Sequence, residues 1–265
     1  MRDLNSVILY DKEAIVLKNI INQLDKNVKI FPSPYDLAKE FAREMVIMIV
    51  ESAEKDKQFT VALSGGSTPE LLYSLLGENY AETVPWQYVQ IFWGDERCVP
   101  PDNGESNFGM TMRKLLSKIE IPSHNIHRIR GEDDPVKEAA RYSEEVSLFT
   151  RKRDGMPLFD LILLGLGEDG HTASIFPGHT ELLDSDKIYD VALHPVTRQK
   201  RISLTGRVIN NADSVTFLVA GNKKEEIVEK LFRKDPAASN YPASYIVPVH
   251  GRLIWFIDQE AGRLL

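Results

Sequence analysis

From Val28 to the C-terminus, short runs of β-branched and apolar residues alternate with longer amphipathic segments of helical period. This alternation is typical of an α/β protein whose mostly parallel sheet is covered by helices on both faces. Strands are expected at 28–31, 59–63, 88–93, 126–129, 159–164, 188–193, 201–204, 214–219 and 253–257.

Helices are expected where a capping residue precedes a proline. Ser33-Pro34, Thr68-Pro69 and Asp134-Pro135 are typical helix starts, and the helices that follow should end near 54, 76 and 149. A further helix is expected from about 223 to 232. Residues 1–25 carry only a weak helical pattern and are interpreted as an N-terminal helical extension. No Gly/Ser linker or internal repeat divides 26–265, so this range is predicted to be a single domain.

The net charge of the chain limits the kinds of molecule that the protein is expected to bind. The formal net charge is −7 and no long Lys/Arg block is present, whereas a nucleic-acid-binding protein must neutralise many phosphates. Nucleic acid is therefore excluded as a partner. A small phosphorylated molecule stays possible, because one phosphate needs only a few basic side chains and backbone N–H groups.

The composition also indicates the cellular compartment in which the protein is expected. Cys98 is the single cysteine, so no internal disulfide is possible, and no Cys/His zinc spacing occurs. The first residues do not read as a signal peptide, and the longest apolar run, 45–50, is too short to span a bilayer. We expect a cytoplasmic protein that binds neither a metal nor a membrane.

The first candidate site segment, 64–70, lies where a strand ends and a helix begins. Gly65 and Gly66 allow close approach of the backbone, and a helix that starts at Ser67 and Thr68 presents free N–H groups to an anion. These four residues are candidate phosphate ligands. The alternative is an ordinary turn in which Ser67 and Glu70 form a capping box.

The second segment contains Asp95, Glu96 and Arg97, again at the end of an apolar strand. In open α/β sheets, ligands bind beyond the carboxyl ends of the strands. We therefore expect Asp95 among the catalytic residues and Arg97 among the phosphate ligands. The alternative is a solvated acidic turn.

The third segment, 159–178, is the most informative. Gly165, Gly167 and Gly170 match the dinucleotide fingerprint G-x-G-x-x-G, but Glu168 and Asp169 would place negative charge where a pyrophosphate must bind. We interpret the glycines as a means of exposing Asp169 and His171. Histidine suits general base catalysis near neutral pH, and a carboxylate beside it can orient the ring and stabilise its protonated form. A structural histidine is the alternative.

Basic residues late in the chain are candidate phosphate ligands as well. Arg201 begins a predicted strand, and Lys223 follows Gly221 after another. Each of these, like the neighbouring Arg198, Lys200 and Lys224, could reach a phosphate from a neighbouring strand end, and we select Arg201 and Lys223. The alternative is that both residues are merely solvated at the surface.

Five segments together resemble the glucosamine-6-phosphate isomerase/6-phosphogluconolactonase family, and specifically its 6-phosphogluconolactonase branch. They are 64–69, 94–97, 106–107, 165–177 and 242–248, and their order and spacing match from about Val28 onward. The run 170–177, Gly-His-Thr-Ala-Ser-Ile-Phe-Pro, is the most specific. The segment before Arg201 departs from the family's proline-rich pattern, so the resemblance does not fix which basic residue there meets the phosphate.

The resemblance implies a Rossmann-like three-layer α/β/α fold and an enzyme that needs neither a metal nor an organic cofactor. It implies hydrolysis of 6-phospho-D-glucono-1,5-lactone to 6-phosphogluconate in the oxidative pentose phosphate pathway, with His171 as the general base. The expected partner is this small phosphorylated lactone, and the protein is expected to be a monomer or a small homo-oligomer.

Two other functions are compatible with parts of this pattern. Glucosamine-6-phosphate deaminases resemble the chain at the glycine loop and at Asp169 to His171, but they carry a glutamate where this sequence has Phe176. An apolar ring cannot perform acid–base chemistry, which favours the hydrolase. A non-catalytic sugar-phosphate-binding protein would not need the Asp169/His171 pair.

Overall fold

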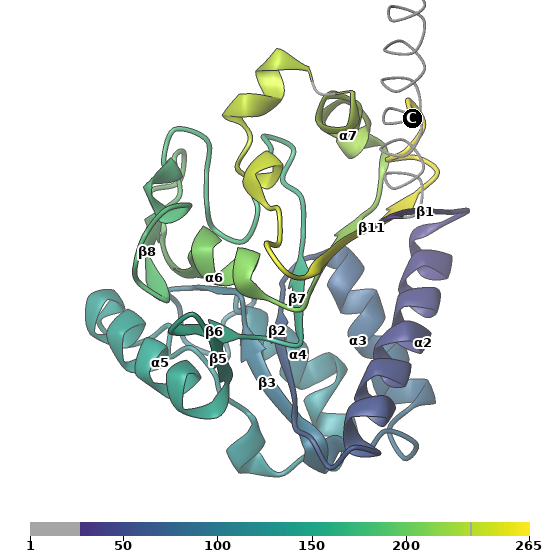
Figure 1. Ribbon diagram of the computed structural model, residues 1–265, viewed down its shortest axis with the longest axis vertical. Helices are drawn as coiled ribbons and strands as arrows, with labels where there is room; N and C mark the ends of the chain where they lie inside the picture. Colours follow the sequence, from purple (N-terminus) through teal and green to yellow (C-terminus); the bar gives the residue numbers. More distant parts are fainter. Residues whose placement is uncertain (1–26, 234) are drawn as a thin grey trace, which may run out of the picture.

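The computed structural model describes residues 27–233 and 235–265, and Figure 1 shows their arrangement. The extension predicted at 1–25 lies outside the described residues. Six strands form one parallel sheet in the spatial order β1 (Val28–Phe31), β11 (Arg252–Asp258), β10 (Ser214–Val219), β7 (Leu161–Leu164), β2 (Phe59–Leu63) and β3 (Val89–Trp93).

Helices cover both faces of this sheet: α2 and α3 lie on one side and α5 and α6 on the other (Figure 1). The helices are α2 (Pro34–Ala53), α3 (Ser67–Asn79), α4 (Asn107–Lys114), α5 (Pro135–Phe149), α6 (Gly206–Asn211) and α7 (Glu225–Phe232). Short 3-10 turns occur at η1 (Trp86–Tyr88), η2 (Leu116–Lys118), η3 (Ser123–Asn125), η4 (Thr180–Leu182), η5 (Asn222–Lys224), η6 (Pro236–Asn240) and η7 (Pro242–Tyr245). The predicted three-layer α/β/α architecture is confirmed.

The predicted starts of α2 and α5 are stabilised by side-chain caps. The Ser33 hydroxyl accepts a hydrogen bond from Asp36 N, and the Asp134 carboxylate accepts one from Lys137 N, both at 3.1 Å. Each cap precedes a proline at the first helical position, where the missing N–H costs no hydrogen bond. These local signals explain why both helix starts were predictable.

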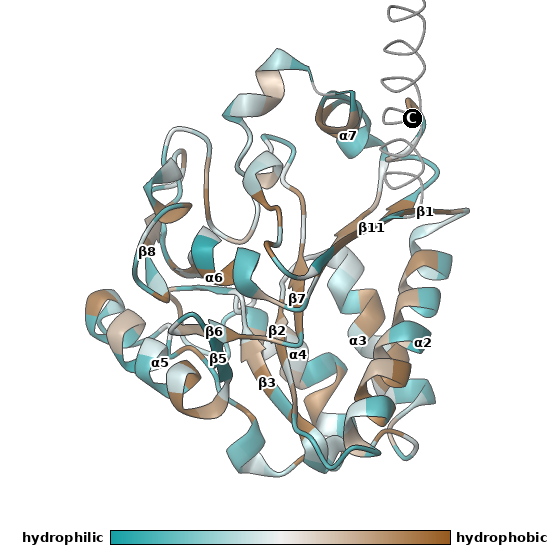
Figure 2. Cartoon of the chain, viewed as in Figure 1, coloured by the Kyte–Doolittle hydropathy of each residue, from teal (hydrophilic) through white to brown (hydrophobic). Residues whose placement is uncertain are grey.

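The core lies between the sheet and its helices. Every residue of β2, β3, β7 and β10 is buried, as expected of parallel strands that are covered on both faces. Figure 2 shows these strands as predominantly hydrophobic, whereas the helices carry hydrophobic and hydrophilic surface side by side. No helix in the described ranges combines the length and hydropathy needed to cross a membrane.

Three predicted segments differ from the observed structure. The ranges 188–193 and 201–204 do form strands, β8 (Tyr189–Leu193) and β9 (Lys200–Leu204). They pair with β4 (Asp95–Arg97) in a separate antiparallel sheet, and β5 (Arg151–Arg153) pairs with β6 (Met156–Leu158) in a hairpin. The predicted strand 126–129 was wrong, because this segment meets the sheet edge at a single bridge between Ile126 and Ile91.

The strand order places two loops at the centre of the molecule. From β2 the chain moves outward to β3, whereas from β7 it moves the other way, to β10 and then β11, and β2 and β7 are neighbours. The connections that leave these two strands therefore diverge. Such a switch point opens a crevice beyond the carboxyl ends of the strands. The glycine-rich segments that follow β2 and β7 both enter this crevice.

Candidate active site

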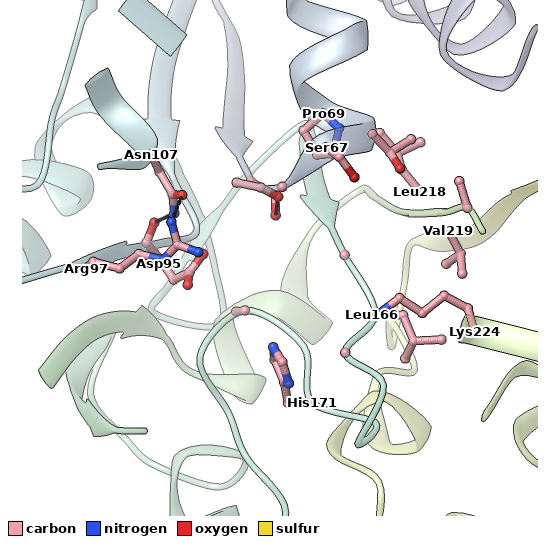
Figure 3. A pocket seen from close by; sticks show the side chains of 18 of the residues that line it. Ser67, Pro69, Asp95, Arg97, Asn107, Leu166, His171, Leu218, Val219 and Lys224 are labelled. Atoms are coloured by element: carbon pink, nitrogen blue, oxygen red, sulfur yellow. Dashed lines mark hydrogen bonds between the residues drawn. The ribbon is translucent and has the colours of Figure 1, made fainter. Parts of the chain in front are cut away.

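A cavity of about 240 Å³ lies at this switch point. In Figure 3, Asp95, Arg97 and Asn107 lie at the left, Lys224 lies at the right, and His171 lies below them. The cavity is lined by residues 64–69, Asp95, Arg97, Asn107, 165–167, His171, Ala173, Arg201, 218–220 and Lys224. All the site residues predicted from the sequence line this cavity except Asp169 and Lys223. Asp169 does not line it but is hydrogen-bonded to His171, which does.

The loop after β2 presents an open helix terminus to the cavity. Gly66 is the N-cap residue of α3, with φ of +109°, and no side chain caps the helix. The alternative capping box of Ser67 and Glu70 does not form, because Glu70 instead pairs with Lys114 at 2.9 Å. The Ser67 and Thr68 amides at the helix start are left for an anion.

Asp95 and Arg97 project from β4 onto the opposite wall. Asp95 is buried, and its Oδ2 accepts a hydrogen bond from Ser174 Oγ at 2.7 Å. Arg97 Nη1 donates to Asn107 Oδ1 at 2.9 Å. Asn107 Nδ2 in turn donates to the backbone oxygen of Asp95 at 2.9 Å. The alternative of a solvated acidic turn is therefore wrong: residues 95–97 form a short strand, in which the side chain of Asp95 is held by Ser174 and that of Arg97 by Asn107 of α4.

Two arginines face each other beside this wall. Arg97 and Arg201 are direct cross-strand partners in the β4–β9 pairing, an arrangement that like charges disfavour. The Nε atoms of both are buried and have no hydrogen-bond partner among the described residues. Burial lowers the pKa of Arg201. Two adjacent guanidinium groups with unused donors form an environment suited to an anion.

His171 and Asp169 form a hydrogen-bonded pair at the mouth of the cavity. His171 Nδ1 lies 2.5 Å from Asp169 Oδ1, and His171 N donates to the same oxygen at 3.1 Å. Burial favours the neutral form of Asp169, but the hydrogen bond and charge of His171 outweigh it and lower the pKa of Asp169 to about 2. Because the ionised carboxylate engages Nδ1, Nε2 is the ring nitrogen left to act on a ligand.

The glycines of the β7 loop give this pair its space. A Cβ at Gly167 would overlap the His171 ring and Asp169 Oδ1, and Gly167 N donates to His171 O at 2.8 Å. Gly170 has φ of +83° and packs against Tyr241. The G-x-G-x-x-G spacing therefore follows from the packing of the histidine loop and does not indicate a dinucleotide site.

Phe176 packs against both His171 and Arg201. Its buried ring lies with its centroid 4.9 Å from that of His171, and the Arg201 guanidinium carbon lies 5.6 Å from the Phe176 centroid. An aromatic ring at this distance attracts a guanidinium. Phe176 thus packs against the base and a candidate anion ligand and offers no acid–base group of its own.

The two lysines before α7 occupy different environments. The Lys223 side chain is 76% exposed, does not line the cavity, and lies with Nζ 3.8 Å from Glu168 Oε1. Lys224 does line the cavity. Burial lowers the pKa of Lys224, although the charges of Glu168 and Asp169 act in the opposite direction. Lys223 was therefore the wrong choice of the two, because its neighbour Lys224 is the lysine that lines the cavity.

Two further site residues were missed, Asn107 and Ser174, and Lys224 was considered but not selected. Asn107 and Ser174 lie within segments that carried the family resemblance, but no residue-level argument gave them a role, because their partners come from distant strands. In the described part of the chain, no cluster of three or more His, Cys, Asp or Glu could hold a metal ion.

The fold and the site define an α/β protein with a cavity lined by basic side chains and a histidine–aspartate pair at a topological switch point. The sequence profile of the family described as glucosamine-6-phosphate isomerases/6-phosphogluconolactonase matches residues 32–255, and the chain belongs to this family.

Individual relatives agree with this assignment. The chain is 39% identical to the 6-phosphogluconolactonase of Haemophilus influenzae over 89% of its own length and 98% of that protein. It is 41% identical to the 6-phosphogluconolactonase of Synechocystis, over 82% and 89%. Among solved structures, 6-phosphogluconolactonase from Trypanosoma brucei superposes with a TM-score of 0.82 at 28% identity, over 90% and 98% of the two chains.

Proposed function

We propose that this protein is a carboxylic ester hydrolase that converts 6-phospho-D-glucono-1,5-lactone to 6-phosphogluconate in the oxidative pentose phosphate pathway. The observation that carries the proposal is the His171–Asp169 pair at the mouth of a cavity whose walls bear cationic side chains and an open helix terminus. Relatives that bear the name 6-phosphogluconolactonase and align along nearly their whole length support it.

The phosphate of the substrate is assigned to the start of α3. The amides of Ser67 and Thr68 point their partial positive charge toward the ligand, and Gly65 and Gly66 allow its approach. Arg97 and Arg201, with Lys224 in place of the predicted Lys223, supply the charge-assisted hydrogen bonds. Holding the phosphate orients the ring, and orientation contributes much of the rate advantage of a positioned reaction.

His171 is assigned as the general base of the hydrolysis. Its Nε2 removes a proton from water while the water oxygen attacks C1, and the ionised Asp169 stabilises the resulting imidazolium. The tetrahedral intermediate collapses as the bond between C1 and the ring oxygen breaks. His171 then returns its proton to that ring oxygen, which completes the addition of one water molecule. Asp95 is assigned to hold a sugar hydroxyl, since its carboxylate faces the cavity and is oriented by Ser174.

The alternatives are less compatible with the site. A deaminase or aldose–ketose isomerase requires a second acid–base group near the histidine, whereas Phe176 is apolar and buried. A sugar-phosphate-binding protein would not require an oriented histidine. Location in the cytoplasm, a monomeric or small homo-oligomeric state and the absence of nucleic-acid binding remain predictions from the sequence.

The decisive test is acid release from freshly generated lactone in weak buffer. We expect the wild-type protein to exceed the spontaneous rate, and His171→Ala to lose roughly 10²–10⁴-fold in kcat with little change in KM, because the base acts in the transition state. His179→Ala is the matched control, because the His179 side chain is 43% exposed and does not line the cavity. Wild-type release at the spontaneous rate would reject the function, and full turnover by His171→Ala would reject the base.

A further inference from the structure

Glu96 is a buried carboxylate beside the cavity that none of the steps above uses. Its exposed fraction is 2%, and it does not line the cavity. Both of its oxygens are fully engaged. Oε1 accepts from Arg97 N and Asn107 N, each at 2.8 Å, and Oε2 accepts from Ser106 Oγ at 3.0 Å and Phe108 N at 2.8 Å.

A buried carboxylate is costly unless its charge is compensated. All four donors to Glu96 are neutral, and three of them are backbone amides, two at the start of α4. Burial nevertheless raises the pKa of Glu96. The role of this buried carboxylate is therefore sought in the two elements that its four hydrogen bonds connect.

The hydrogen bonds connect β4 to the first turn of α4 across the loop 98–105. Each of these two elements supplies one half of a contact that faces the cavity: Arg97 comes from β4 and Asn107 from α4. Asn107 also packs so tightly against Gly65 that a Cβ there would overlap its Oδ1. The position of Asn107 therefore affects both the Arg97 guanidinium and the phosphate loop.

We propose that Glu96 is a positioning residue for substrate binding, whose carboxylate holds the start of α4 on β4 and so directs Arg97 and Asn107 into the cavity. This inference rests on the proposed function, since it takes the anion held by Arg97 to be the substrate phosphate. Glu96 neither lines the cavity nor bonds to His171, and it acts on the bound anion through the Arg97 guanidinium, which Asn107 holds.

The carboxylate is required because it can accept at both oxygens. A glutamine in its place could accept at Oε1, but its amide nitrogen would face the Phe108 N–H, so at least one hydrogen bond would be replaced by a contact between two donors. The loss would loosen the joint between α4 and β4. The His171–Asp169 pair belongs to the β7 loop and would keep its geometry.

The test separates KM from kcat. We expect Glu96→Gln to raise KM for the lactone, and the inhibition constant for inorganic phosphate, about tenfold, while kcat changes by less than about threefold. Glu138→Gln is the matched control. Glu138 is also a buried carboxylate at a helix start, where it accepts from Arg130 N at 2.8 Å, but it lies outside the cavity lining. Its removal should leave both constants unchanged.

A double-mutant cycle tests the route through Arg97. In an Arg97→Ala background, Glu96→Gln should raise KM by less than about twofold, because the group it positions is already gone. Additive effects would overturn the proposal, and so would a folded Glu96→Gln protein with wild-type KM and phosphate inhibition. If Glu96→Gln does not fold, Glu96→Asp, which keeps the charge but shortens the reach, provides the same comparison.

Calorimetric titration with inorganic phosphate keeps this test independent of turnover. If the wild-type protein fails to hydrolyse the lactone, the proposed function falls, yet weaker phosphate binding by Glu96→Gln would still support the positioning role. Equal phosphate binding by the wild-type and Glu96→Gln proteins would overturn that role.

Discussion

The proposed role of His171 depends on two neighbours that contact different parts of its ring. Asp169 engages Nδ1 and, with its pKa lowered to about 2, remains ionised throughout the neutral range. Phe176 packs against the ring and limits its rotation. One neighbour fixes which nitrogen carries the hydrogen and the other fixes where the ring points, so Nε2 is prepared for a proton transfer before any ligand binds.

The adjacent lysines Lys223 and Lys224 offer a test at the scale of single residues. Lys224 lines the cavity and Lys223 does not. We expect Lys224→Ala to raise KM for the lactone roughly tenfold, because a charge-assisted hydrogen bond to the phosphate is lost. Lys223→Ala makes the same change in net charge one residue away and should leave KM within about twofold. Steady-state acid release at varied lactone concentration measures both.

Equal effects of the two substitutions would contradict this assignment, because they would indicate general electrostatic attraction in place of a direct contact. The lysine pair also shows where the sequence was insufficient. Gly221 marks the turn, but only the 3-10 geometry of η5 decides which of two consecutive lysines turns inward. Asn107 was missed for a related reason, since its partner Arg97 lies ten positions earlier on another element.

At the scale of elements, the β7 loop is shaped around the histidine. Gly167→Ala would place a methyl group against the His171 ring and Asp169. We expect kcat to fall about 10²-fold, since misplacement of a catalytic group by about 1 Å is enough for such a loss. The measurement is kcat for the lactone, with circular dichroism to show that the fold persists.

Gly104→Ala is the control for this substitution, because a Cβ at Gly104 meets nothing within 4 Å. Its kcat should equal that of the wild-type protein. An undisturbed kcat in Gly167→Ala would show that the loop tolerates a side chain, and the steric interpretation of the glycine would then be wrong.

The elements that the sequence predicted well are those with strong local signals. Proline and side-chain caps marked α2 and α5, and continuous apolar runs marked β2 and β10. No strand was predicted at 95–97, because Asp95, Glu96 and Arg97 are polar, and only their pairing with β9 makes them a strand. Conversely, 126–129 looks like a strand but finds a partner only through Ile126. Pairing between distant segments, which no local pattern contains, decided both cases.

At the scale of the whole molecule, the parallel sheet assembles a site that no single segment possesses. The glycine loop 64–68 follows β2, Asp95 and Arg97 follow β3, the His171 loop follows β7 and Lys224 follows β10. Parallel strands bring all of these carboxyl ends to one edge of the sheet. The strand pattern in the sequence predicts this convergence, which is why most cavity-lining residues could be named from isolated motifs.

This arrangement also predicts which part of the chain is sufficient for catalysis. All cavity-lining residues fall between Ser64 and Lys224, and the first described strand, β1, begins at Val28. We therefore expect a protein that lacks residues 1–25 to keep wild-type kcat and KM. Steady-state kinetics and thermal unfolding of the shortened and full-length chains provide the comparison. If the shortened protein unfolds cooperatively but has a raised KM, residues 1–25 contribute to the site, and the boundary placed at residue 26 does not separate an extension from a self-sufficient catalytic domain.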